Sequence, residues 1–420
     1  MKILNIGDLN DNVYVLSKFT KAEIHQINFP RKQVDLVTIS EKGIEFFDSL
    51  LISKQVHRIN QIKHKFDLCL VLSWAGARVA YLAGLNYIIY FVGDDIRNPP
   101  FAKNKNPQIF LHVKTPYNYN FIEKIFYKKI LNSAIACVTA SQELFNELKK
   151  YRDQNIECIE LAIDTTMFNE NTQPLNKPKK KFTFFCPQRI GIEKGYDILW
   201  DALRLCKSDF EILQSQWFIE NSTISEFENI HDPFNKKLLE DVPSQIKFVP
   251  LIKREEVPRW FMWADGIIGQ LSIGYHGATE MEAAFCKKPV VHYSDPQIKY
   301  TVNGEKITAP FLPHSKNPKE VARIIDKVVT SQEFRKKLAE EENKFVKDIG
   351  DSKFIASKWD KIFEKMYQKH GTINRKDNFS INSLNIFALL AEKFVYSKTM
   401  KKRNIEAWGE EEYLKLTKSN

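Results

Sequence analysis

Two basic side chains, Arg189 and Lys194, occupy a short stretch whose flanking patterns place it where a phosphate could bind. Residues 182–186 form an apolar, aromatic run typical of a buried strand, and residues 198–203 repeat apolar side chains at helical spacing. A loop that leads from a parallel strand into a helix lies at the carboxyl end of the sheet, where α/β folds hold anionic ligands. Two cations there suit a diphosphate, although loop arginines and lysines are usually just solvated.

A second pattern lies about eighty residues further along the chain. Residues 264–277 indicate a strand and a glycine loop with Gly274 and Gly277, and residues 278–291 indicate a helix bearing Glu282 and then a Pro-Val-Val strand. Glycines let the backbone approach phosphate closely, and the dipole of the following helix adds to the attraction. This segment, together with Arg189 and, after four residues, Lys194-Gly, resembles the nucleotide-binding half of family 4 glycosyltransferases.

The resemblance covers roughly residues 1–370 and implies a GT-B fold, in which two Rossmann-like, doubly wound α/β domains face a cleft. It implies a retaining, hexosyltransferase-like transfer from a nucleotide-diphosphate sugar to a glycan or lipid-linked acceptor, in cell-surface polysaccharide or glycolipid biosynthesis. No metal or other cofactor is expected, because Arg189 and Lys194 supply positive charge to the leaving diphosphate as the catalytic residues. The donor-binding residues carried over are Gly7, Ile252, Gly274, Gly277 and Glu282, with Glu282 on the ribose hydroxyls and the backbone at Ile252 on the base.

The sequence departs from the family pattern around the donor sugar. Family members carry two glutamates separated by seven residues, but counting back from Glu282 reaches Gly274 instead of the first glutamate. Val92 stands where related proteins have a histidine in the cleft. Two other functions stay open: a nucleotide-sugar epimerase of the same fold class, and a catalytically silent nucleotide-sugar-binding protein. The loss of two polar groups favours the silent protein.

Other residues are therefore expected to form hydrogen bonds with the hydroxyl groups of the donor sugar. His276 lies in the glycine loop, and Asp94 and Asp95 follow a predicted strand over residues 87–92. A carboxylate pair at a strand end can bind sugar hydroxyls or act as a base, so Asp94 and Asp95 are also candidates for the acceptor or sugar site. Turns rich in aspartate that merely cap helices are at least as common.

Composition sets the broad class. A chain of 420 residues exceeds what one hydrophobic core usually serves, so two domains are expected. No apolar run approaches the roughly 20 residues of a membrane-spanning helix, and residues 1–7 indicate a first strand rather than a signal peptide. The six cysteines are scattered singly, so neither a zinc site nor a disulfide framework is indicated. These features predict a cytoplasmic protein.

The net charge of +10 is compatible with several anionic partners, namely nucleic acid, an anionic membrane surface or phosphorylated substrates. The lysines are spread along the whole chain, and no zinc-finger, basic-zipper or RNA-recognition signature is present. Nucleic acid is therefore not expected as a partner. The expected partners are a nucleotide sugar and a glycan or lipid-linked acceptor.

Alternating strand-like and helix-like patterns predict the domain organisation. Residues 1–169 are expected to form the N-terminal, acceptor-side domain and residues 170–350 the donor domain. Residues 351–370 are expected to return to the first domain as a crossover helix, and residues 371–420 to form a helical tail of unknown role. Within the first domain, the patterns predict a strand over 34–39, a long helix over 44–65 and a long loop over 98–119.

Residues 121–131 form a basic amphipathic pattern with two possible interpretations. The helix could lie on an anionic membrane surface, with Lys124, Lys128 and Lys129 close to lipid. Alternatively, it could bury Phe121, Ile125 and Ile130 against its own sheet while the lysines face water. The first interpretation makes the protein a peripheral membrane protein on the cytoplasmic face.

Overall fold

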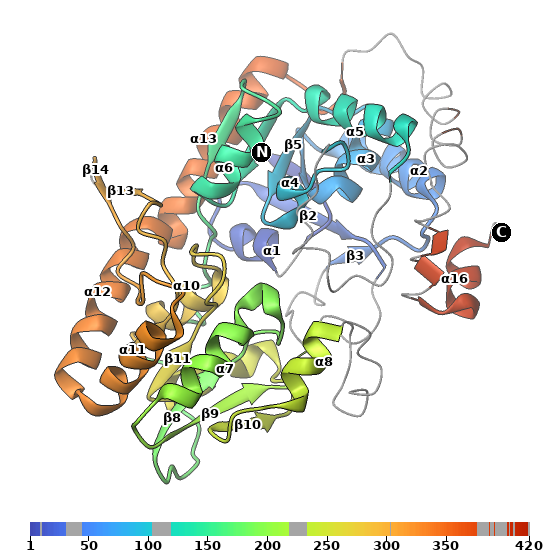
Figure 1. Ribbon diagram of the computed structural model, residues 1–420. Coiled ribbons are helices and arrows are strands. Elements are labelled where there is room, and N and C mark those ends of the chain that lie inside the picture. Colours follow the sequence, from blue (N-terminus) through green and yellow to red (C-terminus); the bar gives the residue numbers. More distant parts are fainter. Residues whose placement is uncertain are drawn as a thin grey trace.

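The computed structural model describes residues 1–8, 11–30, 44–102, 119–217, 233–302 and 304–375, and parts of the tail up to residue 418. The predicted strand over 34–39 and most of the predicted loop over 98–119 lie outside these residues. Two parallel sheets, each accompanied by helices, form the two lobes of Figure 1. No helix in the described part of the chain combines the length and the apolar character needed to cross a bilayer.

The first sheet has seven strands in the order β3-β2-β1-β4-β5-β6-β7, and every pairing is parallel. Its central strands are buried on both faces, as expected of a parallel sheet covered by helices. The strands are β1 (Lys2–Ile6), β2 (Glu23–Asn28), β3 (Glu45–Phe46), β4 (Leu68–Leu72), β5 (Tyr87–Phe91), β6 (Ala136–Thr139) and β7 (Ile156–Cys158).

The helices of the first domain alternate with its strands, which confirms the predicted doubly wound pattern. They are α1 (Asn12–Ser17), α2 (Ile52–Ile62), η1 (Lys63–Lys65), α3 (Ser73–Leu82), α4 (Asp94–Arg97), α5 (Phe121–Ser133) and α6 (Gln142–Lys149). The helix predicted over 44–65 is wrong in its first part. Residues 45–46 instead pair with β2 at the edge of the sheet, and the helix begins at Ile52 after Leu51, which is extended.

The second sheet has five parallel strands in the order β10-β9-β8-β11-β12. They are β8 (Phe182–Cys186), β9 (Phe210–Ser215), β10 (Ile246–Val249), β11 (Gly266–Ile268) and β12 (Val290–Val291), and a hairpin of β13 (Tyr300–Val302) and β14 (Glu305–Ile307) follows. The helices are η3 (Ile192–Lys194), α7 (Tyr196–Leu205), α8 (Pro233–Glu240), η5 (Arg254–Glu256), α9 (Val257–Trp263), α10 (Ala278–Phe285), α11 (Pro318–Thr330) and α12 (Gln332–Gly350). The proposed domain boundary at 169/170 lies between β7 and β8.

Helix α13 (Ser352–His370) follows α12 of the second domain and packs on the first (Figure 1). Its side chains Ile355, Trp359 and Phe363 belong to the same hydrophobic core as the strands of the first sheet. The Trp359 ring meets Tyr90 of β5 edge to face, with ring centroids 4.9 Å apart. The first domain is therefore built from two separate stretches of the chain.

The described part of the tail includes α16 (Glu410–Thr417), which lies beside the first domain near α2 in Figure 1. The carbonyl of Leu416 accepts hydrogen bonds from the Leu50 amide, at 3.1 Å, and from the Ser49 hydroxyl, at 2.8 Å. Tyr413 is buried in this contact region. Apolar residues in the sequence between 387 and 396 predict a packed helix in the tail. Of these, Leu390 is exposed, and the others lie outside the described residues, namely Phe387, Leu389, Phe394 and Tyr396.

Candidate active site

The structure brings the two sequence patterns together at the carboxyl edge of the second sheet. Strands β8 and β11 pair directly, so the loops that follow them are neighbours. The Lys194 carbonyl accepts a hydrogen bond from the Leu271 amide at 2.9 Å, and the Ser272 hydroxyl donates to the Glu193 carbonyl. Gly195 makes this approach possible. Its φ is +80°, and a Cβ there would lie 2.8 Å from the Leu271 carbonyl carbon.

Arg189 and Lys194 both lie in the loop after β8, at the edge predicted for them, and both side chains are half-buried. The Arg189 guanidinium lies over the ring of Trp217, 5.9 Å from its centroid. Trp217 also fixes the loop through its carbonyl, which accepts from the Ile190 amide at 2.9 Å. A guanidinium stacked on an aromatic face keeps its N–H groups available around its edge.

Glu280 organises the glycine loop, a role that its position in the sequence did not predict. It is 2% exposed and stands in the first turn of α10, where its carboxylate accepts from the amides of Gly277 at 2.7 Å and Gln270 at 2.9 Å. The amide side chain of Gln188 donates to it at 2.6 Å. Glu280 thus ties the start of α10 to the loops that follow β8 and β11. A glutamate three residues after a glycine at a helix start is the short-range signal that could have revealed it.

Lys194 is close enough to Glu280 to influence its ionisation. Burial acts to raise the pKa of Glu280, but the pKa is lowered overall because His292, Lys194 and the amides of Gln270 and Gly277 favour the carboxylate. Burial also lowers the pKa of His292, so we assign the stabilisation of the Glu280 charge mainly to Lys194 and the two amides. The Lys194 ammonium therefore lies within electrostatic reach of the Glu280 carboxylate at the start of α10, where a diphosphate would be attracted.

Glu282 is buried rather than exposed, which rules out a solvated surface glutamate. It is 3% exposed, and both of its carboxylate oxygens accept hydrogen bonds from the guanidinium of Arg254, one of them at 2.7 Å. Glu282 lies two residues after Glu280, about 200° further round α10, and its carboxylate has a different hydrogen-bond partner. Arg254, in η5 after β10, was not expected here, because nothing in the local sequence links it to α10.

The remaining predicted donor residues of the second domain occupy the same edge. Gly274 has a φ of +77° and its carbonyl accepts from the Asp295 amide at 2.9 Å, while Gly277 immediately precedes α10. Ile252 lies between β10 and η5 with its side chain buried in the second core. A Cβ at Gly274 would lie 2.7 Å from the Asp295 Cβ, so the structure has no room for the family's glutamate at this position.

His276 does not present its ring to a ligand in this conformation. It is 1% exposed and stacks on Tyr275, and its Nδ1 lies 3.3 Å from the Tyr300 hydroxyl. Burial lowers the pKa of His276 to about 3, so the ring is neutral. The assignment of His276 to a donor hydroxyl stays a prediction, and it requires the loop to open.

The predicted residues of the first domain lie at the carboxyl edge of the first sheet. Gly7 follows β1 with a φ of +83°, and Asp94 begins α4 after β5. The Asp95 carboxylate accepts from the amides of Gly93 at 3.1 Å and Ile96 at 3.0 Å, which is the capping role that we considered beside a sugar-binding role.

The two edges meet through Tyr275 of the glycine loop. Its hydroxyl donates to the Glu160 carboxylate, which follows β7, and lies 3.2 Å from the Ala140 carbonyl, which follows β6. Burial raises the pKa of Glu160 to about 7, although the Tyr275 hydrogen bond acts in the opposite direction. The candidate donor loop is thus in direct contact with the first domain through a group that titrates near neutrality.

We expect Glu160 to make stability depend on pH. Because the pKa of Glu160 in the folded protein is higher than the ordinary glutamate value of 4.5, the folded state holds this proton more tightly. The contribution is fully present below about pH 4.5 and is lost as the pH rises through 7. The free energy of unfolding should therefore fall by on the order of 3 kcal/mol over this range, and Glu160→Gln should remove the fall. Urea unfolding at a series of pH values measures it.

The matched control is Glu157→Gln, at an exposed carboxylate of β7 that faces Lys365. This variant should keep the wild-type slope. A wild-type slope in Glu160→Gln would show that Glu160 does not titrate in this range.

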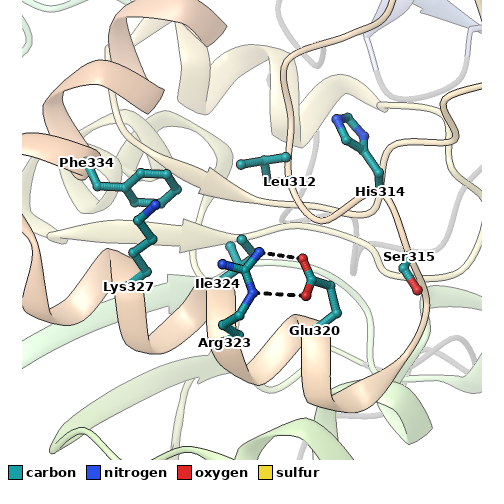
Figure 2. Close-up of a pocket in the computed structure, with 8 residues that line it drawn as sticks. All are labelled: Leu312, His314, Ser315, Glu320, Arg323, Ile324, Lys327 and Phe334. Carbon is teal, nitrogen blue, oxygen red and sulfur yellow. Dashed lines mark hydrogen bonds and ion pairs between the residues drawn. The ribbon is translucent and has the colours of Figure 1, made fainter.

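The pocket in Figure 2 lies elsewhere in the second domain, between the loop at 312–315 and helices α11 and α12. Its volume is about 340 Å³, and none of the predicted site residues lines it. Its cations already have partners: Arg323 pairs with Glu320 at 2.6 Å, and Lys327 lies 4.2 Å from the centre of the Phe334 ring. In the described ranges, no three histidine, cysteine or carboxylate side chains gather as a metal site would require.

Comparison with known proteins agrees with this arrangement. Residues 167–345 match the family model of glycosyl transferases group 1, and no curated protein matches the sequence. Similar solved structures include Anabaena HepE with UDP-glucose (17% identity, 88% of this chain and 100% of that chain, TM-score 0.61). A Rickettsia africae glycosyltransferase is also similar (18% identity, 87% of this chain and 98% of that chain, TM-score 0.61). So is a Thermosynechococcus elongatus sucrose-phosphate synthase (13% identity, 88% of this chain and 100% of that chain, TM-score 0.60). The chain therefore has the GT-B fold, and residues 167–345 are similar to glycosyl transferases group 1.

Proposed function

We propose that this protein is a glycosyltransferase that moves a sugar from a nucleotide-diphosphate donor to an acceptor. One observation carries the proposal: Lys194 and the glycine loop before α10 are joined at the carboxyl edge of the second sheet, with Arg189 on the same loop as Lys194. This is where a diphosphate would meet both side-chain cations and a helix start. Support also comes from HepE, a protein of similar fold whose structures hold UDP and UDP-glucose.

The proposed chemistry uses the chain's own charges. Breaking the anomeric C–O bond leaves a diphosphate, so negative charge grows on the leaving oxygen in the transition state. Arg189 offers a planar fork of N–H donors and Lys194 a compact charge, and both would stabilise that oxygen. No metal is needed for this step, and the family resemblance assigns it retention at the anomeric carbon.

The test is a donor screen followed by turnover. Wild-type protein is incubated with a panel of nucleotide sugars, the best binder is identified by thermal shift, and its products are followed by mass spectrometry with glycan and lipid-linked acceptor extracts. Transfer to an acceptor supports the proposal. Conversion of the donor without an acceptor favours an epimerase. Binding without transfer or hydrolysis favours a silent binding protein.

The same panel tests which residues read the sugar. We propose His276, with Asp94 or Asp95, for this role. His276→Ala and Asp95→Asn should then change the preference among donors rather than reduce all donors equally. If nucleoside diphosphate binds wild type as well as every nucleotide sugar, no residue reads the sugar and the binding-protein alternative replaces the enzyme.

We further propose that the protein works on the cytoplasmic face of a membrane, in polysaccharide or glycolipid synthesis, and that α5 contacts the lipid. Its capping box of Asn120 and Glu123 fixes the helix start, and Glu123 and Ile130 face inward. Phe121 and Ile125 were expected to be buried if the helix served only its own domain. They are instead 76% and 53% exposed. The outward face also carries Ile122, Lys128 and Lys129.

We expect weak binding to vesicles that contain anionic phospholipid, and little binding to neutral vesicles. Each basic residue near the surface contributes about 1 kcal/mol, and salt screens this attraction. Lys128→Glu together with Lys129→Glu should reduce co-sedimentation strongly. The control is Lys336→Glu with Lys337→Glu, an exposed pair at the same spacing on α12. The proposal would be contradicted if binding stayed the same whatever the lipid charge, the salt concentration or the lysine pair that is substituted.

A further inference from the structure

The ion pair between Arg254 and Glu282 joins two segments of the candidate site that are 28 residues apart. Arg254 belongs to η5, after β10, and Glu282 belongs to α10, after β11. The two guanidinium nitrogens each donate to a different carboxylate oxygen, which is the planar, two-bond geometry that only arginine provides. The exposed fractions of the two side chains are 17% and 4%, so the pair is largely shielded from water.

Arg254 is itself held from other directions. Its guanidinium carbon lies 4.6 Å from the centre of the ring of Phe168, a fully buried residue in the segment between the domains. Two further carboxylates attract the guanidinium. Asp11 lies in the loop after β1 of the first domain, and Asp164, which pairs with Lys18 at 2.6 Å, lies in the same intervening segment as Phe168. Burial acts to lower the pKa of Arg254, but these carboxylates, Glu282 first among them, raise it overall. The guanidinium is therefore a fixed charge.

The geometry leaves Glu282 able to accept further hydrogen bonds. A carboxylate offers about four acceptor positions on its two oxygens, and the guanidinium uses two. Two acceptor positions remain, and the two-bond pair sets their direction because it fixes the carboxylate plane. A pair of adjacent hydroxyl groups, such as those of a ribose, matches two oxygens held in one plane.

We infer that Arg254 is a positioning residue, which holds the Glu282 carboxylate in the one orientation that accepts the ribose hydroxyls of a nucleotide donor. The inference rests on the proposed function. Arg254 does not touch the donor in this role. Its effect should therefore appear only for ligands that carry the hydroxyls, and not for the diphosphate held by Arg189 and Lys194.

The experiment compares UDP with 2′,3′-dideoxy-UDP by calorimetry, with ADP and GDP as alternative bases. Hydrogen bonds to a charged group contribute about 10- to 100-fold in affinity, so wild type should prefer the hydroxylated ligand by a ratio of this order. Glu282→Gln and Arg254→Met should bring the ratio close to one. Arg254→Lys keeps the charge without the planar fork and should give an intermediate ratio. The control Arg259→Met removes an exposed arginine of α9 and should keep the wild-type ratio.

The outcomes distinguish failure of the proposed function from failure of the role inferred for Arg254. If wild type binds none of the nucleoside diphosphates, the proposed function fails and the inference with it. If wild type prefers the hydroxylated ligand and Arg254→Met prefers it equally, only the inference fails. Arg254→Met leaves Glu282 without its cation, and where this variant does not fold, Arg254→Lys decides: a full wild-type ratio overturns the inference. Equal affinity of wild type for both ligands also overturns it.

Discussion

Lys194→Ala should slow sugar transfer by about 100- to 1,000-fold while the protein stays folded. The reason lies in where the side chain is held. Lys194 is close enough to Glu280 to favour its carboxylate, beside the start of α10, and its backbone is fixed by the hydrogen bond from Leu271. A cation held there before the reaction stabilises charge on the leaving diphosphate without having to reorganise.

The measurement is the turnover number with the donor identified by the screen, together with thermal unfolding. Arg189→Ala should give a loss of similar size, because it removes the second cation from the same loop. The matched control is Lys207→Ala, which removes an exposed lysine from a loop of the same domain. Full activity in Lys194→Ala would show that this loop does not serve the leaving group.

Gly195→Ala should lower both stability and activity, and it is the second large effect we expect. A non-glycine residue at a φ of +80° costs about 1–3 kcal/mol. The added Cβ would also lie 2.8 Å from the Leu271 carbonyl carbon and 3.0 Å from the Ser272 amide nitrogen, so the two loops would have to separate. Their separation would move Lys194 away from α10, and transfer should fall together with the free energy of unfolding.

A second glycine allows the two causes to be distinguished. Gly304 has a φ of +86°, but a Cβ there would meet no atom within 4 Å. Gly304→Ala should therefore show the conformational cost alone and leave transfer unchanged. Urea unfolding of the two variants gives the difference. Equal destabilisation would mean that the approach of the two loops is not what requires glycine at position 195.

Much of the fold was predictable because its signals are local. The β-α alternation and the glycines that end strands are set by neighbouring residues, and they correctly placed Lys194 and Gly274 on loops at one sheet edge. The strand β3 was missed because an edge pairing of two residues leaves almost no pattern in the sequence. The apolar residues of 44–51 were therefore read as the start of the helix that begins at Ile52.

The contacts that define the candidate site were less predictable. Arg254 meets Glu282 across 28 residues, and Tyr275 meets Glu160 across 115, so neither pair shares a periodic segment. Such pairs depend on which strands are neighbours in a sheet and on how the two domains meet. The exposed apolar face of α5 was difficult for a similar reason. Sequence gives its amphipathic pattern, but only the packing shows that Phe121 and Ile125 face outward.

Helix α13 has a consequence for how the chain is made. The core of the first domain needs Trp359 and Phe363, which are synthesised after the whole second domain. On a ribosome, the first sheet therefore emerges early but lacks one of its covering helices until the second domain has been synthesised. The second sheet, whose strands and helices are continuous in the chain, has no such delay. The domain translated first is thus the one that completes its core last.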